Sequence, residues 1–198
     1  IHPTADVSAN AVISENVQIW HQAQVRENAF IGENSILGKN VYVDKGVRVG
    51  KNCKIQNNCS LYHGLTLEDG VFIGPHTVTA NDAHPRAING DGTLKRDSDW
   101  KEGKILIMEG ASIGARVVIL PKVTIGRFAM VGAGSIVTKD VPDFGLVYGS
   151  PARLMGWVCR CGRKLEEGKG AGDWCGGCEL SSTKPAGDVT NHFVRTSG

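Results

Sequence analysis

Aliphatic residues recur along this chain with a period of six. An α-helix repeats its apolar face about every 3.6 residues and a β-strand every second residue, so neither alone produces a strict period of six. A short strand followed by a tight corner does. The series, counted from the first residue, is Ile1, Val7, Ile13, Ile19, Val25, Ile31, Leu37, Val43, Val49, Ile55, Leu61, Leu67 and Ile73. The pattern therefore predicts an all-β chain of short strands wound into a coil.

A second series, mostly of small or β-branched residues, stands two positions before the aliphatic residues. It reads Ala11, Val17, Ala23, Ala29, Ser35, Val41, Val47, Cys53, Cys59, Leu65, Val71 and Thr77. Gly often follows the aliphatic residue, as in Ile31-Gly32 and Ile73-Gly74. We expect the aliphatic side chains to point inward and Gly or Asn to adopt the turn conformations. Three hexads would close a triangular coil, and coils would stack at about 4.8 Å.

The period breaks after Thr79 and resumes at Ile107, and the distance between Ile73 and Ile107 is not a multiple of six. Residues 80–104 between the two runs are polar and rich in turn residues, such as Asn89-Gly90-Asp91-Gly92. The sequence therefore predicts one long loop that protrudes from a regular coil. Loops on rigid scaffolds are where functional residues concentrate.

Composition and charge exclude several classes of protein. The formal net charge is +2, and no basic cluster indicates a nucleic-acid-binding surface. Neither a membrane-spanning apolar run nor a signal peptide is visible, although the sequence begins at Ile1 and a short leader could precede it. The six cysteines are divided between two in the middle and four near the C-terminus. This division fits a reducing, cytoplasmic compartment better than a disulfide framework.

The hexad pattern over residues 1–157 resembles the hexapeptide-repeat acyltransferases. The resemblance implies a left-handed parallel β-helix, a homotrimer, and an active site between neighbouring subunits. The segments 131–142 and 148–153 look like the coenzyme A segment of that family, which implies that acetyl-CoA is the co-substrate. The residues that would contact it are Gly132, Ala133, Lys139, Pro151 and Arg153. Small residues would let the pantetheine arm lie along the coils, and Lys139 or Arg153 can meet phosphates.

A narrower resemblance rests on residues 67–75, on Asn81 and Pro85-Arg86-Ala87, and on Ile19-Trp20-His21 with Arg26. These strings look like enzymes that N-acetylate the 3-amino group of a UDP-linked 2-acetamido-3-amino-2,3-dideoxy-glucuronate for surface polysaccharide. The expected function is thus transfer of an acetyl group from acetyl-CoA to a nucleotide-linked amino sugar. The amine would attack the thioester directly, without an acyl-enzyme.

Asn81 is the first candidate catalytic residue, because its carbonyl oxygen can accept a hydrogen bond from the amine and orient it toward the thioester. Asp82 or His84 could take the proton that acyl transfer to an amine releases. The departing thiolate could also collect it. His63 and His76 are expected to be surface or ladder residues of the coil, with the base as their alternative role.

Cationic side chains would bind the carboxylate and diphosphate of such an acceptor. Arg26 and Arg86 are the candidates, with His21 near by, because Arg binds these groups in a bidentate manner. Each could equally be an ordinary solvated side chain. Cys53 and Cys59 fall in the inward-pointing series and are expected to be core residues rather than nucleophiles.

The sequence changes character after Trp157. Cys159 and Cys161 are followed by Cys175 and Cys178, and two close pairs of thiolates can surround a tetrahedral Zn²⁺. Residues 158–180 resemble a zinc ribbon, although the first pair has Cys-x-Cys spacing instead of Cys-x-x-Cys. A disulfide pair and a ribbon that no longer binds metal are the alternatives. Such a short appendix would depend on metal to fold, and residues 181–198 are expected to be a flexible tail.

Other functions remain open on the sequence alone. The acyl acceptor could be a sugar hydroxyl or an amino acid. The same β-helix serves as a zinc carbonic anhydrase, which needs three converging histidines, and His63, His76 and His84 lack the expected close pair. A non-enzymatic scaffold is a third possibility.

Overall fold

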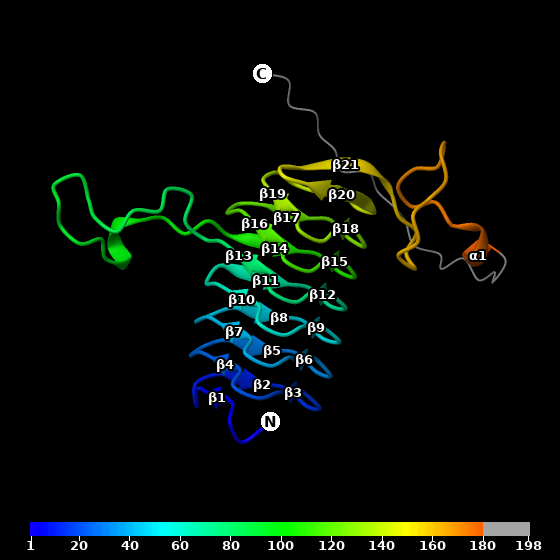
Figure 1. The fold of residues 1–198 in the computed structure, drawn as a ribbon. Coiled ribbons are helices and arrows are strands. Elements are labelled where there is room, and N and C mark those ends of the chain that lie inside the picture. Colours follow the sequence, from blue (N-terminus) through cyan, green and yellow to red (C-terminus); the bar gives the residue numbers. More distant parts are fainter. Residues whose placement is uncertain (180–198) are drawn as a thin grey trace.

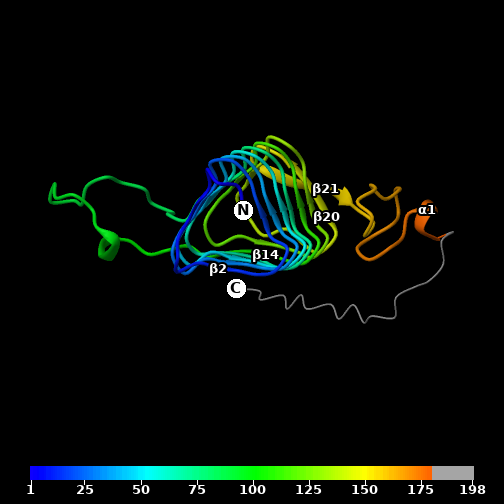
Figure 2. The ribbon, with the colours of Figure 1, turned by 90° about the horizontal axis from the view of Figure 1, so that it is seen from below.

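Three β-sheets form the walls of a triangular coil in the computed structural model, which describes residues 1–179 (Figures 1 and 2). The expected tail over residues 181–198 lies outside the described residues. Sheet A contains β1 (Asp6–Val7), β4 (Gln24–Val25), β7 (Tyr42–Val43), β10 (Ser60–Leu61), β13 (Val78–Thr79), β16 (Val118–Ile119) and β19 (Ile136–Val137). Sheet B contains β2 (Val12–Ile13), β5 (Phe30–Ile31), β8 (Arg48–Val49), β11 (Leu65–Leu67), β14 (Ile105–Ile107) and β17 (Thr124–Ile125). Sheet C contains β3 (Gln18–Ile19), β6 (Ile36–Leu37), β9 (Lys54–Ile55), β12 (Phe72–Ile73), β15 (Ser112–Ile113), β18 (Met130–Val131), β20 (Gly145–Gly149) and β21 (Ala152–Trp157).

Each coil advances by three hexads. Asp6 pairs with Gln24, Gln24 pairs with Tyr42, and Tyr42 pairs with Ser60, so the register repeats along the sheet. We call the turns that join successive sheets the A–B, B–C and C–A corners. The predicted fold class is confirmed: this is an all-β, parallel stack of triangular coils, and it fits the left-handed β-helix.

From Ile19 onward the aliphatic series fills the interior of the coil, whereas Ile1 at the open end is 68% exposed. Ile31, Leu37, Ile55 and Ile113 are completely buried, and they belong to one continuous core that runs through the stack. Cys53 and Cys59 also lie in this core. Burial raises the pKa of both thiols, which keeps them in the neutral form expected of core residues.

Asn and Gly both make turns at the corners, as expected. The left-handed backbone conformation is found at asparagines such as Asn34 (φ 59°) and Asn52 (φ 56°) and at glycines such as Gly110 (φ 67°). The Gly that directly follows the aliphatic residue is needed for a different reason. A Cβ on Gly114 would lie 2.5 Å from the backbone nitrogen of Ala133 on the next coil. The glycines that directly follow an aliphatic residue therefore allow coils to approach closely, whereas asparagines and other glycines make the turns.

The predicted loop projects from the A–B corner between β13 and β14 (Figures 1 and 2). Val78 of β13 pairs with Val118 of β16, so the sheet continues across the insertion without losing register. Apart from one 3-10 turn, η1 (Asp97–Asp99), and an isolated bridge between Ile88 and Leu94, the loop has no regular structure. It is therefore an excursion that leaves the β-helix intact.

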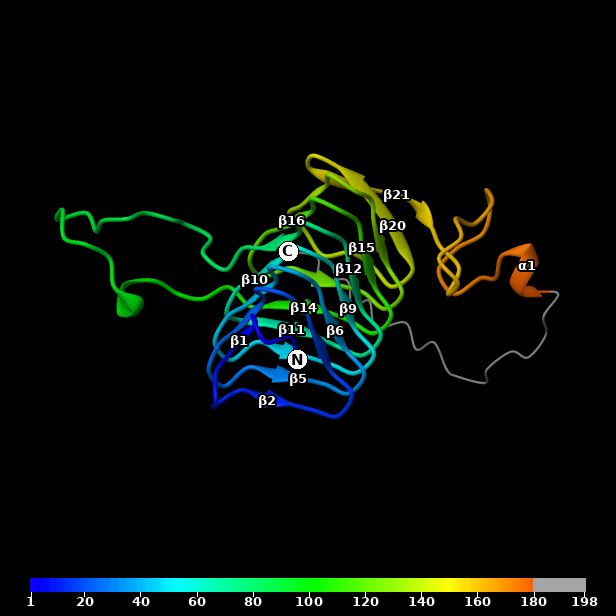
Figure 3. The same ribbon diagram turned by 60° about the horizontal axis from the view of Figure 1, so that its bottom comes forward.

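The coil ends in a hairpin and a small appendix. β20 and β21 pair antiparallel, and the chain then leaves the side of the coil (Figure 3). A bridge joins Val158 to Lys164, and the appendix ends in the short helix α1 (Gly176–Glu179). Across residues 1–179 no helix has the length and apolar character needed to cross a membrane.

Candidate functional site

Four polar side chains form a ladder up the A–B corner, one on each of four successive coils. Glu27, Lys45, His63 and Asn81 stand at equivalent positions, two residues after the paired strand residues Val25, Val43, Leu61 and Thr79. The ladder ends where the loop leaves the coil. The repeat of the β-helix thus places chemically different side chains in one row that ends at the start of the loop.

Asn81 is held by the residue below it. Its Nδ2 donates to the backbone carbonyl of His63 at 3.2 Å, and its own backbone carbonyl accepts the N–H of Gly103 at 2.8 Å. Only the amide nitrogen can face a carbonyl oxygen, so the contact fixes the orientation of the side-chain amide. Asn81 Oδ1 is therefore the atom that the side chain can offer to a ligand as an acceptor.

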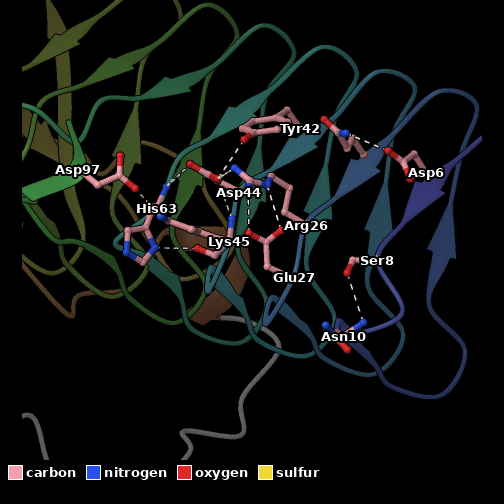
Figure 4. Close-up of polar contacts among 11 residues, drawn as sticks. Asp6, Ser8, Asn10, Arg26, Glu27, Tyr42, Asp44, Lys45, His63 and Asp97 are labelled. Atoms are coloured by element: carbon pink, nitrogen blue, oxygen red, sulfur yellow. Dashed lines mark hydrogen bonds and ion pairs between the residues drawn. The ribbon is translucent and has the colours of Figure 1, made fainter. Parts of the chain in front are cut away.

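His63 joins the coil to the far end of the loop. Its Nδ1 lies 2.7 Å from the carbonyl oxygen of Lys45, and its Nε2 lies 3.0 Å from a carboxylate oxygen of Glu102. Lys45 in turn forms an ion pair with Asp97 of the loop at 3.3 Å. Figure 4 shows Lys45, His63 and Asp97 gathered at this corner. The contact of His63 with Glu102 and the ion pair of Lys45 with Asp97 therefore tie the returning arm of the loop to the ladder.

Arg26, on the coil below Lys45, belongs to an ion-pair network (Figure 4). Its guanidinium contacts Glu27 at 2.7 Å and Asp44 at 3.1 Å. Asp44 is buried and also accepts the Tyr42 hydroxyl at 2.9 Å and the backbone N–H groups of Lys45 and His63. Burial favours the neutral acid, but these hydrogen bonds outweigh it and lower the pKa of Asp44. Arg26 is thus already committed to two carboxylates.

A pocket of about 460 Å³ opens at this corner. Its lining includes the ladder residues Lys45, His63 and Asn81, the loop residues Trp100 and Glu102, and Arg26. Two predicted site residues, Asn81 and Arg26, are therefore brought together in one pocket. The pocket combines hydrogen-bond acceptors, cations and one indole ring, which suits a polar ligand of small-molecule size.

The other predicted acceptor-site residues lie outside this pocket lining. Asp82 accepts the backbone N–H of His84 at 2.7 Å, which caps the start of the loop. Arg86 is exposed, and its guanidinium donates to the carbonyl of Pro85. His21 stacks on His2 at the C–A corner, on the opposite edge of sheet A from Arg26. A single chain therefore does not bring His21 and Arg26 together.

The predicted coenzyme A residues lie at the last coils. Gly132 and Ala133 are at the C–A corner, and Tyr148 packs so closely on Gly132 that a Cβ there would lie 2.8 Å from the Tyr148 Cβ. Lys139 is exposed at the A–B corner, above Asn81, and Pro151 and Arg153 are exposed around the β20–β21 hairpin. Gly132 and Ala133 are thus separated from Asn81 by the width of sheet A.

The four late cysteines converge. The sulfur atoms of Cys159, Cys161, Cys175 and Cys178 all lie within 4.8 Å of one another. In a tetrahedral site with Zn–S bonds of about 2.3 Å the sulfurs are about 3.8 Å apart, so the cluster closes around Zn²⁺ with a small contraction. The crowding raises the pKa of Cys178 to about 12, chiefly through contacts with Cys161 and Cys175. Within residues 1–179 no histidine belongs to any group with this arrangement of metal donors.

The sequence did not indicate that His63 and Glu102 meet in this pocket. Glu27, Lys45, His63 and Asn81 follow one another at intervals of one coil. Once the coil length is known, the sequence therefore predicts that they form a ladder. Glu102 carried no such signal. It reaches His63 only because the loop folds back on the corner, and no periodic pattern describes that path.

Comparisons with known proteins agree with the repeat. The pattern described as the hexapeptide repeat of succinyl-transferase matches residues 29–63, and the bacterial transferase hexapeptide pattern of six repeats matches residues 104–139. A solved hexapeptide-repeat acetyltransferase from Vibrio cholerae, complexed with acetyl coenzyme A, is 28% identical with a TM-score of 0.54. The alignment covers 71% of this chain and 72% of that one.

Curated relatives match over shorter stretches. A dTDP-3-amino-3,6-dideoxy-alpha-D-galactopyranose 3-N-acetyltransferase from Aneurinibacillus thermoaerophilus is 55% identical over 64 residues, which is 32% of this chain and 33% of that protein. A galactoside O-acetyltransferase from Escherichia coli is 37% identical over 90 residues, 46% of this chain and 42% of that protein. The chain thus spans about a third to two fifths of these relatives. The matched repeats and the solved relative support a hexapeptide-repeat acyltransferase.

Proposed function

We propose that the protein transfers an acetyl group from acetyl-CoA to the amino group of a nucleotide-linked amino sugar. The acceptor that we assign is a UDP-2-acetamido-3-amino-2,3-dideoxy-glucuronate type sugar, used for surface polysaccharide. The observation that carries the proposal is Asn81, whose Nδ2 is held by the coil so that Oδ1 is the atom left to accept a hydrogen bond, in a pocket beside the loop. The 55% identity to a sugar 3-N-acetyltransferase supports an amine acceptor.

In the proposed reaction the sugar amine attacks the acetyl carbonyl carbon directly. Asn81 Oδ1 accepts a hydrogen bond from the amine and aims its lone pair at the thioester. The C–N bond forms as the C–S bond breaks, and coenzyme A leaves as the thiol after taking up a proton. No cysteine or serine nucleophile is required, which agrees with the buried positions of Cys53 and Cys59.

A homotrimer completes the proposed site. Gly132 and Ala133 lie on the opposite edge of sheet A from Asn81, so a neighbouring copy is needed to bring a coenzyme A segment to the amine pocket. Rotational symmetry would form three equivalent sites in this way. His21 and Arg86, which lie away from the pocket within one chain, would approach the acceptor only from such a neighbour or through movement of the loop.

Mixed trimers test this arrangement. Asn81→Ala removes the proposed amine contact, and Ala133→Glu places bulk and negative charge on the proposed pantetheine path. Each variant alone should be inactive, but co-refolded mixtures should regain activity because some interfaces then carry both wild-type halves. Mixtures that stay inactive, although mixed trimers form, would overturn a site shared between neighbours.

An acceptor panel tests the function itself. Thiol release from acetyl-CoA would be measured with the 3-amino sugar, with UDP-2-acetamido-2-deoxy-glucuronate, which has a hydroxyl at the same carbon, and with serine. We expect release with the amine alone. Release with the hydroxyl sugar, as the O-acetyltransferase relative suggests, or with serine would change the assigned acceptor.

The appendix is proposed to hold structural Zn²⁺ on Cys159, Cys161, Cys175 and Cys178, because the four sulfurs form one cluster of the right size. Zinc would fix a segment whose own apolar core is small and contains Leu165, Trp157 and Trp174 beside the cysteines.

A further inference from the structure

The first half of the cysteine cluster lies directly on the coil. We call residues 159–162, which contain the first two cysteines, the first knuckle. The backbone N–H of Val158, just before it, donates to the carbonyl of Phe144 at 2.8 Å. Gly162 lies against Met130 of β18, and a Cβ there would be 3.3 Å from the Met130 methyl group. The first knuckle is therefore in contact with the last coils on two sides.

Arg160 adds a third contact, at the B–C corner. Its guanidinium carbon lies 4.5 Å from the centre of the Phe128 ring, and one of its nitrogens lies 3.8 Å from the Glu109 carboxylate. A guanidinium over the face of an aromatic ring is attracted by the charge distribution of the ring. Phe128 in turn stacks on Phe144, with the ring centres 5.5 Å apart. The knuckle is thus joined to a pair of stacked rings on the coil.

These two rings occupy positions where the repeat otherwise favours small or polar residues. Phe128 (φ 52°) and Phe144 (φ 60°) have the left-handed backbone conformation, which the same corner gives to Asn34 and Gly110 on lower coils. A bulky aromatic residue is uncommon in that conformation and is found where the surroundings hold it there. At Gly110 any side chain would collide with the Phe128 ring. The corner therefore departs from the repeat where the appendix contacts it.

The strand that leads into the knuckle has little other support. β21 is the edge strand of sheet C, and β20 is its one partner in that sheet. Leu154 and Met155 of β21 are 49% and 46% exposed, so the strand buries little apolar surface. Segments with few buried apolar contacts open most easily. The position of β21 therefore depends on its two ends, the hairpin turn and the first knuckle.

The metal cluster sets the position of Arg160. Cys159 and Cys161, on either side of Arg160, turn their sulfur atoms toward Cys175 and Cys178. A metal on the four sulfurs would hold the backbone on both sides of Arg160. Without it the appendix has only a small core, so more conformational entropy would be lost when Arg160 meets the ring.

We propose that zinc binding controls the affinity for coenzyme A through Arg160. With zinc bound, Arg160 is held on Phe128 and fixes β21, and the hairpin then presents Pro151 and Arg153 to the coenzyme. Without zinc the hairpin leaves this conformation for part of the time. Arg160 is a positioning residue, because it acts through β21 and does not contact the coenzyme. The inference rests on the proposed function, namely on the proposed zinc site and coenzyme A segment.

Calorimetric titration of the full chain with coenzyme A tests the inference. The protein would be titrated with zinc bound, after a chelator has removed the zinc, and after zinc has been returned, with elemental analysis of each sample. If the zinc-free hairpin holds the binding conformation about a tenth of the time, the Kd rises about tenfold. Returned zinc should restore the Kd. The KM for the sugar acceptor should not change, because the acceptor pocket is at the A–B corner.

Two variants separate the role of Arg160 from a general effect of zinc on the fold. Arg160→Ala keeps all four cysteines, so it should bind zinc fully yet bind coenzyme A as weakly as the zinc-free wild type. Phe128→Asn should have the same effect, and asparagine suits the φ of +52° at this position. The double variant should bind coenzyme A no more weakly than either single variant, because both remove one contact.

The control is Arg127→Ala, which removes an exposed arginine from the same corner and should keep the wild-type response to zinc. The inference is overturned if the zinc-free wild type, or zinc-loaded Arg160→Ala, has the wild-type Kd for coenzyme A. The second of these outcomes needs no metal removal, so it decides even if the zinc-free protein aggregates. A zinc-loaded wild type that binds no coenzyme A would instead overturn the proposed function, and a wild type that binds no zinc would overturn the metal site and this inference together.

Discussion

Asn81 donates its side-chain amide to the backbone carbonyl of His63, the residue one coil below it, at 3.2 Å. The contact connects the coil with the start of the loop. A completed coil supplies the carbonyl, and the first residues of the loop supply the amide. The orientation of Asn81 is therefore built into the repeat and does not depend on the tip of the loop.

Asn81→Ala should lower kcat with the amine acceptor about 100-fold, because the amine loses the group that orients it. The affinity for coenzyme A should stay within twofold, because the proposed contact of Asn81 is with the amine and not with the pantetheine arm. Steady-state kinetics and calorimetric titration with coenzyme A would measure the two effects. Equal loss of both would show that the change disrupts the trimer instead.

Asp44 should make the free energy of unfolding depend on pH in the acid range. Its pKa is lowered in the folded protein, so its ionised form adds stability above the unfolded value of about 3.9, and this stability is lost as the pH falls through the folded pKa. Asp44→Asn should cost about 1–3 kcal/mol at pH 7, because backbone and hydroxyl donors lose their acceptor. Urea denaturation from pH 7 to pH 2 should show a smaller acid-induced loss in the variant. Parallel curves would contradict the prediction.

Gly114→Ala should destabilise the coil by about 1–3 kcal/mol, the usual cost of overpacking. The new Cβ would lie 2.5 Å from the backbone nitrogen of Ala133, so two coils must separate locally. Gly90→Ala on the loop is the matched control, because nothing lies within 4 Å of its Cβ position. Chemical denaturation of both variants would decide, and equal stabilities would contradict the role of these glycines in close packing.

One Zn²⁺ should bind per chain, and Cys161→Ser should reduce that amount sharply. Trp157 and Trp174 pack against the cluster that contains Cys159 and Cys175, so chelation should change tryptophan fluorescence. Cys59→Ala removes a thiol of the coil core and should retain the metal. Elemental analysis would measure the zinc. A wild-type protein without metal, or a Cys161→Ser variant with a full complement, would refute the metal site.

The repeat could be predicted because each hexad obeys the same packing rule. Ile31, Ile55 and Ile113 belong to the aliphatic series that predicts the coil, and all three are buried in it. The need for glycine at position 114 could not be predicted, because it depends on the distance between the backbones of two neighbouring coils, which the sequence alone does not give. Gly and Asn both suit corners in a sequence, yet here Asn34 makes a turn and Gly114 permits contact between coils.

The candidate site was predicted only in part. Asn81 stood out because it opens the loop, and the structure places it with Arg26 in one pocket. Glu102 lay near the end of an aperiodic segment, where a single carboxylate has no pattern to mark it. His21 and Gly132 were assigned through resemblance to a family whose active site lies between neighbouring subunits. Within one chain, neither residue therefore lies near Asn81.

The central claim is acetyl transfer to a sugar amine, and the site of acetylation tests it most directly. The protein would be incubated with acetyl-CoA labelled with ¹³C at the carbonyl and with the UDP-linked 3-amino sugar, and the product examined by NMR. The account predicts an amide whose labelled carbonyl correlates with the hydrogen on carbon 3, together with one thiol for each amide. Label found on an oxygen of the sugar, or no product although acetyl-CoA binds, would contradict it.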